Sequence, residues 1–127
     1  MRNEQTVFVV DDDETMRGSL RWLLESLKLN VQTYASAQDF LSAYDPAQPG
    51  CLVLDVRMPG MSGIELLMYL RGTSVADGCS IVAVSGSVTE ADHHLLDHLG
   101  VAHSLTKGPR LADELAAVLA DIRRRAS

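Results

Sequence analysis

Short apolar runs alternate with amphipathic segments along the whole chain. The apolar, β-branched runs predict strands over residues 6–10, 31–34, 51–56, 80–84 and 101–105. Apolar residues that recur at helical spacing predict helices over residues 14–29, 36–44, 64–70, 89–100 and 111–125. Strands that alternate with helices through short connections favour a parallel sheet covered on both faces, with right-handed crossovers. The pattern therefore predicts an α/β, doubly wound fold with a five-stranded parallel sheet.

Signals at the helix ends support these boundaries. Ser36 is a suitable N-cap for the second predicted helix. Thr89, with Asp92 three residues later, has the spacing of a capping box for the fourth predicted helix. Gly100 is expected at the position just beyond the end of that helix, where a left-handed conformation is common.

Length and composition agree with one folded domain over residues 1–127. The 127 residues are 46% hydrophobic and 22% charged, with a formal net charge of −6 and a pI near 5.0. This acidic balance argues against direct binding to nucleic acid, because phosphate backbones attract basic surfaces. No apolar region follows Met1–Gln5 as in a secretory signal, and no apolar stretch approaches the roughly 20 residues of a membrane helix. We expect a soluble cytoplasmic domain that has no membrane segment and no output domain.

Two minor features leave alternatives open. Cys51 and Cys79 lack the spacing of a zinc site, so we expect two reduced thiols, with a disulfide between them as the alternative. Arg123, Arg124 and Arg125 either complement the dipole of the last helix or begin a linker towards a further domain.

The first apolar run ends in an unusual series of acids, in the stretch VFVVDDDE. Asp13 and Glu14 are explained as the start of a helix, where acids favour the helix dipole. Asp11 and Asp12 are different, because an N-cap needs only one side chain. In a sheet ordered 2-1-3-4-5, the first and third strands flank the switch point where ligands bind, and Asp55 ends the third strand. Three converging carboxylates need a compensating cation, and Mg²⁺ suits such oxygen ligands best.

Four motifs at strand ends identify a family. They are VVDD after the first strand, LDVRMPGMSGIELL at residues 54–67, Ser85-Gly86 after the fourth strand, and Lys107 after the fifth. In this order and spacing, the chain resembles the receiver domain of bacterial two-component response regulators. The residues of these motifs most resemble those in receivers of transcription regulators with LuxR-type output domains. The resemblance covers essentially the whole chain and implies a flavodoxin-like receiver fold.

The resemblance also implies a metal site. Asp12 would bind Mg²⁺ directly and Asp11 through water, with Mn²⁺ as a substitute ion. The carboxylate of Asp55 and the backbone carbonyl of Arg57 would complete the protein ligands.

The resemblance implies a role for three further groups. Asp55 would be the phosphoacceptor, taking a phosphoryl group from a phosphohistidine of a sensor histidine kinase. Ser85 would bond a phosphoryl oxygen, and Lys107 would pair first with Asp55 and then with the phosphoryl group. Gly86 would leave room for the incoming group. Such a domain promotes its own phosphorylation in the presence of Mg²⁺ but does not turn over a substrate as an enzyme does.

Two positions depart from the family pattern. Proline usually follows the lysine directly, but Gly108 intervenes here, so a cis peptide would be expected at Gly108-Pro109 if one exists. The family usually has an aromatic residue three positions before the lysine, whereas this chain has Ser104. Because serine has little area to bury, we expect phosphorylation to act through backbone shifts in the fourth helix or fifth strand.

Surface residues suggest partners. Trp22 lies off the apolar stripe of the first helix, and relatives commonly dock the sensor kinase on this helix. Trp22 folding over the helix edge is the alternative. Relatives also commonly form homodimers through the fourth and fifth helices. His93, His94 and His98 are expected on a solvated face opposite Ala91, Leu95 and Leu99, rather than in a metal site.

Three functions follow from the sequence, and the first is a phosphorylatable signalling switch. The second is a degenerate receiver that acts as a protein-interaction module without phosphorylation, which Ser104 and the Lys-Gly-Pro segment favour. The third is an enzyme, either an aspartyl-phosphate hydrolase or a nucleotide-binding oxidoreductase. However, no DxDxT motif surrounds Asp55, and the G-x-G-x-x-G motif that dinucleotide binding needs does not follow the first strand.

Overall fold

The fold alternates five strands with five helices, as the sequence pattern predicts. The computed structural model describes residues 6–44, 50–58, 60–72, 79–86, 90–101 and 103–126. The strands are β1 (Thr6–Val10), β2 (Asn30–Tyr34), β3 (Gly50–Asp55), β4 (Cys79–Ser85) and β5 (His103–Thr106). The helices are α1 (Glu14–Ser26), α2 (Ala37–Ala43), α3 (Gly63–Gly72), α4 (Glu90–His98) and α5 (Leu111–Ala126).

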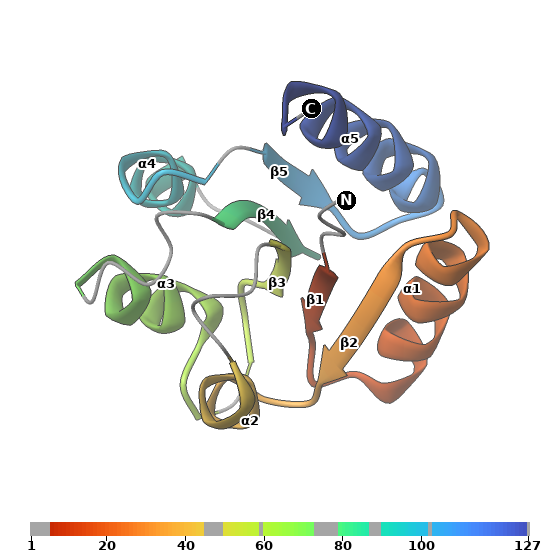
Figure 1. The fold of residues 1–127 in the computed structure, drawn as a ribbon. Coiled ribbons are helices and arrows are strands. Elements are labelled where there is room, and N and C mark those ends of the chain that lie inside the picture. The colour runs from red at the N-terminus through yellow and green to blue at the C-terminus, as the bar shows by residue number, and fades with distance from the viewer. Residues whose placement is uncertain are drawn as a thin grey trace.

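The five strands form one parallel sheet. Their order is β2-β1-β3-β4-β5, so the predicted order and the switch point between β1 and β3 are confirmed. Figure 1 shows α1 and α5 on one face of the sheet and α2, α3 and α4 on the other. Because all strands are parallel, their carboxyl ends lie at one edge of the sheet.

Alternate residues of each central strand enter two separate cores. In β1, Val7 and Val9 face α1 and α5, whereas Phe8 and Val10 face the other three helices. The core under α1 and α5 includes Leu20, Leu24, Val53, Val82, Leu115 and Leu119. The core under α2, α3 and α4 includes Phe40, Leu52, Leu66, Leu67, Ile81 and Leu96. Burial on both faces explains why β1 and β3 are continuous apolar runs.

The predicted caps form where they lie within the described residues. Asp13 is the N-cap of α1, and Ser36 caps α2 by accepting a hydrogen bond from the backbone N–H of Asp39 at 3.0 Å. Gly100, with a φ of 82°, donates to the carbonyl of Asp97, and the N–H of Val101 donates to that of Leu96. This is a Schellman motif. The predicted cap Thr89 lies outside the described residues.

The predicted end of the first helix was wrong. The helix ends at Ser26 rather than Leu29, because Lys28 adopts a left-handed conformation with a φ of 67°. The N–H of Lys28 donates to Glu25 and the N–H of Leu29 to Leu24, so this end is a second Schellman motif. Glycine usually occupies this position, and a lysine gave no sequence signal for it.

Two further predictions about the last third of the chain need correction. The fifth strand begins at His103 rather than at residue 101, because Val101 completes the C-terminal motif of α4. The buried leucine of α4 is Leu96, which is 2% exposed, whereas Leu95 is 36% exposed. The prediction was therefore wrong for Leu95, whereas Leu99 packs against the core and His93, His94 and His98 are exposed as expected. The side chain of Ala91 lies outside the described part.

Other expectations concern single residues. Cys51 is a buried thiol rather than half of a disulfide, while the side chain of Cys79 lies outside the described part. The peptide bonds that the structure describes contain no cis bond, so Gly108-Pro109 is trans. Arg124 is exposed and pairs with Asp121 at 2.9 Å. None of the helices in the described ranges has the length and apolar character needed to cross a membrane.

The burial of α1 predicts a contrast between two neighbouring large side chains. Leu24→Ala should lower the free energy of unfolding by roughly 2–5 kcal/mol, because Leu24 is fully buried and its loss leaves a cavity. Trp22→Ala should change this free energy by less than about 0.5 kcal/mol, because Trp22 is 74% exposed. Urea denaturation of both variants measures the difference, and equal destabilisation would contradict this packing of α1.

Candidate functional site

Backbone hydrogen bonds continue past the strand ends and fix the residues that follow. The N–H of Asp11 donates to the carbonyl of Tyr34 at 3.1 Å, and the N–H of Lys107 donates to the carbonyl of Ser85 at 2.8 Å. Asp55 is itself the last residue of β3. Thus residues from β1, β3, β4 and β5 are held by the sheet at the same edge.

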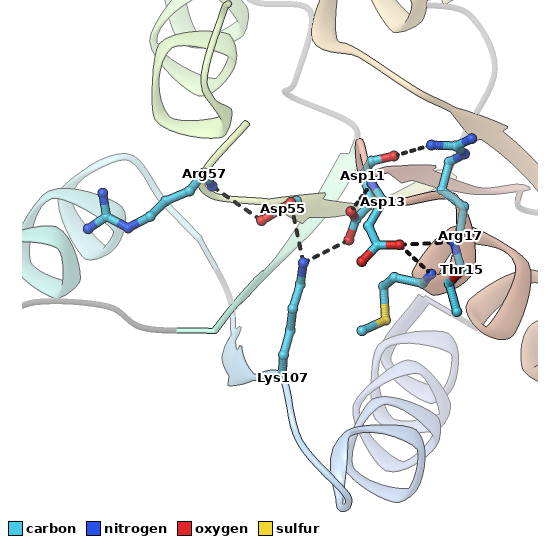
Figure 2. Close-up of polar contacts among 8 residues, drawn as sticks. Asp11, Asp13, Thr15, Arg17, Asp55, Arg57 and Lys107 are labelled. Carbon is cyan, nitrogen blue, oxygen red and sulfur yellow. Dashed lines mark hydrogen bonds and ion pairs between the residues drawn. The ribbon is translucent and has the colours of Figure 1, made fainter. Parts of the chain in front are cut away.

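Three carboxylates converge at the switch point. One carboxylate oxygen from each of Asp11, Asp12 and Asp55 lies within 4.8 Å of the others. Asp11 and Asp55 are buried, whereas Asp12 is exposed. Each buried carboxylate accepts a hydrogen bond from the backbone two residues later: Asp13 N–H to Asp11 Oδ1 at 2.9 Å and Arg57 N–H to Asp55 Oδ1 at 3.2 Å (Figure 2). These short-range bonds orient both carboxylates into the site.

The ammonium group of Lys107 lies between the two buried carboxylates. Figure 2 shows its side chain rising from the loop after β5, with Nζ at 3.1 Å from Asp11 Oδ2 and 3.3 Å from Asp55 Oδ2. The contact with Asp11 is an ion pair without hydrogen-bond geometry, so Asp11 Oδ2 is buried without a hydrogen-bond partner. Three carboxylates and one ammonium leave a formal charge of −2 if all four groups are ionised. The site therefore has an excess of buried negative charge.

Burial, together with the neighbouring negative charge, raises the pKa of Asp55 to about 6. Burial is the main cause and the charge of Asp11 adds to it, whereas the N–H of Arg57 and the ammonium of Lys107 act in the opposite direction. For Lys107, burial lowers the pKa, but the neighbouring carboxylates more than offset this and raise it overall. Lys107 is thus held in its charged form, whereas Asp55 keeps its proton to a higher pH than an ordinary aspartic acid does.

The residues present fit a divalent cation with a preference for oxygen ligands. Three carboxylate oxygens converge, and one buried oxygen of Asp11 has no hydrogen bond to satisfy it. Mg²⁺ binds few protein carboxylates and keeps several waters, which suits a cluster with the exposed Asp12 on its solvent side. When bound, the ion would supply the positive charge that the cluster lacks.

Ser85 and Gly86 follow from the end of β4 at the same edge. Val84 pairs with Asp55 in the β3–β4 ladder, so Ser85 lies one residue beyond the level of Asp55, and it is buried. A Cβ built on Gly86 would contact nothing within 4 Å, so there is open space beside this position. The described residues thus place all the predicted site residues at one edge of the sheet.

The sequence analysis missed residues that support the loop after Asp55. Ser62 and Glu65 form a reciprocal capping box at the start of α3, at 2.9 and 3.2 Å, which the spacing S-x-x-E could have indicated. Gly63 N–H donates to the carbonyl of Val56 at 3.0 Å. A Cβ on Gly63 would overlap the carbonyl oxygen of Asp55, so only glycine permits this approach of α3 to the acceptor residue.

A second missed residue supports the acids after β1. The guanidinium of Arg17 in α1 donates from Nη1 to the backbone carbonyl of Asp11 at 2.8 Å (Figure 2). The contact joins residues six apart in sequence, across the turn from β1 into α1. No periodic or capping pattern in the sequence indicates it.

Helix α4 and strand β5 border an open hollow of about 360 Å³. Its lining includes His93, His94, Asp97, His103 and Ser104. The small, exposed Ser104 stands where the family pattern has an aromatic residue. Among the described residues, these histidines do not join a cluster of three or more metal-ligating side chains.

A parallel sheet of order 2-1-3-4-5, with paired acids after β1, an aspartate ending β3 and a lysine after β5, is the arrangement expected of a receiver domain. The family model for the response regulator receiver domain matches residues 7–119. The chain therefore belongs to the response regulator receiver family.

Curated relatives are response regulators that control transcription. The transcriptional regulatory protein FixJ of Azorhizobium caulinodans is 42% identical over 120 residues, covering 94% of this chain and 56% of FixJ. The transcriptional regulatory protein TdiR of Thauera aromatica is 55% identical over 68 residues, covering 54% of this chain and 30% of TdiR. The chain thus spans about half of the length of FixJ and less of TdiR.

Solved structures share the fold. The response regulator StyR is 40% identical with a TM-score of 0.71, covering 97% of this chain and 64% of StyR. The structure described as FixJ-N is 29% identical with a TM-score of 0.79, covering 93% of this chain and 92% of that one. The chemotaxis protein CheY4 of Vibrio cholerae, at 23% identity, has a TM-score of 0.83 over 93% of this chain and 98% of CheY4, which shows the fold.

The close approach of Gly63 predicts a large effect of one methyl group. Gly63→Ala should lower the free energy of unfolding by more than about 1 kcal/mol, because the added Cβ must displace the backbone of Asp55. Gly18→Ala, in the middle of α1, is the matched control: its Cβ meets nothing within 4 Å, so it should stabilise by roughly 0.5–1 kcal/mol. Thermal unfolding of both variants measures the two effects. A neutral Gly63→Ala would contradict the described loop.

The raised pKa of Asp55 predicts a pH-dependent effect of Asp55→Asn without divalent cations. Since the folded-state pKa of about 6 exceeds the ordinary value of 3.8, ionisation of Asp55 opposes folding. This cost is absent below pH 3.8 and grows as the pH rises through 6. The free energy of unfolding of Asp55→Asn relative to the native chain should therefore increase by roughly 1–3 kcal/mol between pH 4 and pH 8.

Urea denaturation at several pH values measures this increase. Saturating Mg²⁺ should remove most of it, because the cation offsets the charge of ionised Asp55 in the native chain. A difference between the two proteins that is independent of pH would contradict the proposed electrostatics.

Proposed function

We propose that this receiver domain is a phosphorylation-activated switch in which Asp55 accepts a phosphoryl group from the phosphohistidine of a sensor histidine kinase. The observation that carries the proposal is the environment of Asp55. Its buried carboxylate lies between the N–H of Arg57 and the ammonium of Lys107, beside two further acids that fit Mg²⁺. A carboxylate is a weak nucleophile, so transfer requires charge compensation and alignment.

The proposed chemistry assigns one task to each group. An oxygen of Asp55 attacks phosphorus, the P–N bond of phosphohistidine breaks, and the electron pair leaves with the imidazole. Lys107 moves its ion pair from Asp55 to the phosphoryl group, and the hydroxyl of Ser85 donates to a phosphoryl oxygen. Asp11, Asp12, Asp55 and the carbonyl of Arg57 would hold Mg²⁺, or Mn²⁺ in its place. The ion supplies positive charge at the transferred group.

The proposal extends to the context of the domain. Because the chain spans about half of the length of FixJ, control of transcription is proposed for a whole regulator that includes this receiver. The receiver itself signals and does not turn over a substrate. The proposed location is the cytoplasm.

Two surfaces are proposed for protein partners. Helix α1 would dock the sensor kinase, because Trp22 is 74% exposed and Arg21, which pairs with Glu25 at 3.3 Å, lies beside it. Helices α4 and α5 would form a homodimer, as in related receivers.

A second candidate function is an interaction module that has lost phosphorylation. The absence of an aromatic side chain at position 104 favours the interaction module, because no aromatic ring can change rotamer in the hollow between α4 and β5. The converging acids and Lys107 argue against it.

A small phosphodonor separates these two functions. Incubation with acetyl phosphate and Mg²⁺ should add one phosphoryl group, seen as a single adduct by intact-mass spectrometry. Asp55→Asn should give no adduct. Lys107→Ala should reduce the yield at least tenfold, because it removes the positive charge beside the acceptor.

Asp97→Asn is the matched control, since it neutralises an exposed carboxylate outside the acid cluster and should retain full labelling. No adduct on the native chain would favour the interaction module. Steady release of phosphate at enzymatic rates would contradict both functions.

A further inference from the structure

One ion pair joins the loop after Asp55 to helix α4. Arg57 Nη2 lies 2.5 Å from Asp92 Oδ2, and the two residues are 35 apart in sequence. The side chain of Asp92 is only 19% exposed, and Asp92 lies in the first turn of α4. In Figure 2 the Arg57 side chain extends away from Asp55 towards this helix.

Arg57 therefore contacts both Asp55 and helix α4. Its backbone N–H donates to Asp55 Oδ1 at 3.2 Å, while its guanidinium is held by α4. Any change that moves the backbone at residue 57 must move the guanidinium or break the ion pair. A phosphoryl group bonded to one oxygen of Asp55 turns the carboxylate into an acyl phosphate, so Asp55 loses the carboxylate charge that accepts this backbone hydrogen bond.

This ion pair matters because Ser104 has no aromatic side chain that could change rotamer beside α4. We propose that the Arg57–Asp92 ion pair couples the acceptor site to helix α4 and takes the place of such a movement. The inference rests on the proposed phosphorylation of Asp55. Arg57 is a positioning residue through its side chain, since the guanidinium acts on the site through the backbone that it orients.

Coupling of this kind is reciprocal, so the ion pair must also influence the affinity of the site for Mg²⁺. Electrostatics alone predicts opposite effects for the two partners. Asp92→Asn removes a negative charge and should weaken cation binding, whereas Arg57→Gln removes a positive charge and should strengthen it. Loss of the ion pair as a positioning contact predicts weaker Mg²⁺ binding in both variants, because either substitution releases the loop after Asp55.

Calorimetric titration with Mg²⁺ distinguishes these cases. Both single variants should raise the dissociation constant by about two- to fivefold, which is the range for a partly exposed ion pair. The double variant should be no weaker than the weaker single variant, because the pair can be broken only once. Arg57→Lys, which keeps the positive charge, should retain most of the affinity. Thermal unfolding verifies that each variant is folded.

Asp97→Asn on the same helix is the matched control. It removes the same formal charge from an exposed position of α4, and it should change the dissociation constant by less than Asp92→Asn does. Opposite shifts in Arg57→Gln and Asp92→Asn, or equal shifts in the two aspartate variants, would overturn the proposed coupling.

Amide hydrogen exchange gives the readout at helix α4. In the native chain, acetyl phosphate with Mg²⁺ should change exchange in α4, and Asp92→Asn should reduce that change at least twofold while phosphorylation of Asp55 continues. An unreduced response in a phosphorylated Asp92→Asn variant would also overturn the inference. Failure of the native chain to form the adduct is a separate result, which rejects the proposed function itself.

Discussion

The site is organised around a concentration of negative charge where β1 and β3 end side by side. Asp11 and Asp55 are buried there, and one ammonium group, from Lys107, contacts both. Burial strengthens the repulsion between the carboxylates and raises the pKa of Asp55 to about 6. The proposed function depends on the same excess of charge, since it favours a hard cation and, with that cation, an anionic group on Asp55.

The surrounding scaffold resists this repulsion through contacts to the backbone. The sheet ladder continues to Asp11 and Lys107, and Arg17 holds the carbonyl of Asp11 from helix α1. On the other strand, Gly63 packs directly against the backbone of Asp55. Because these contacts fix the main chain, the side chains can be charged and reactive without loss of their positions. Side chains at the ends of rigid strands are positioned more precisely than side chains on long loops.

A signalling domain must convert a local change of charge at its site into a structural change at its surface. Relatives with an aromatic residue beside α4 have a bulky group that can change position, but Ser104 is too small for this role. The ion pair between Arg57 and Asp92 offers a route of a different kind, made of one main-chain hydrogen bond and one charge contact. Because a partly exposed ion pair contributes little energy, the proposed coupling between the site and α4 is expected to be weak.

The sequence by itself determined the order of elements, the glycine cap at Gly100 and the meeting of Asp11 with Lys107 at one sheet edge. These features depend on local period, on turn chemistry and on the rule that parallel strands end together. Only the tertiary structure decided that Leu96 is buried rather than its neighbour, that Arg57 pairs with α4, and that Gly63 must lack a side chain. The physical reason is that helix rotation and long-range partners are set by the packing of whole elements against the sheet, and short sequence patterns do not record it.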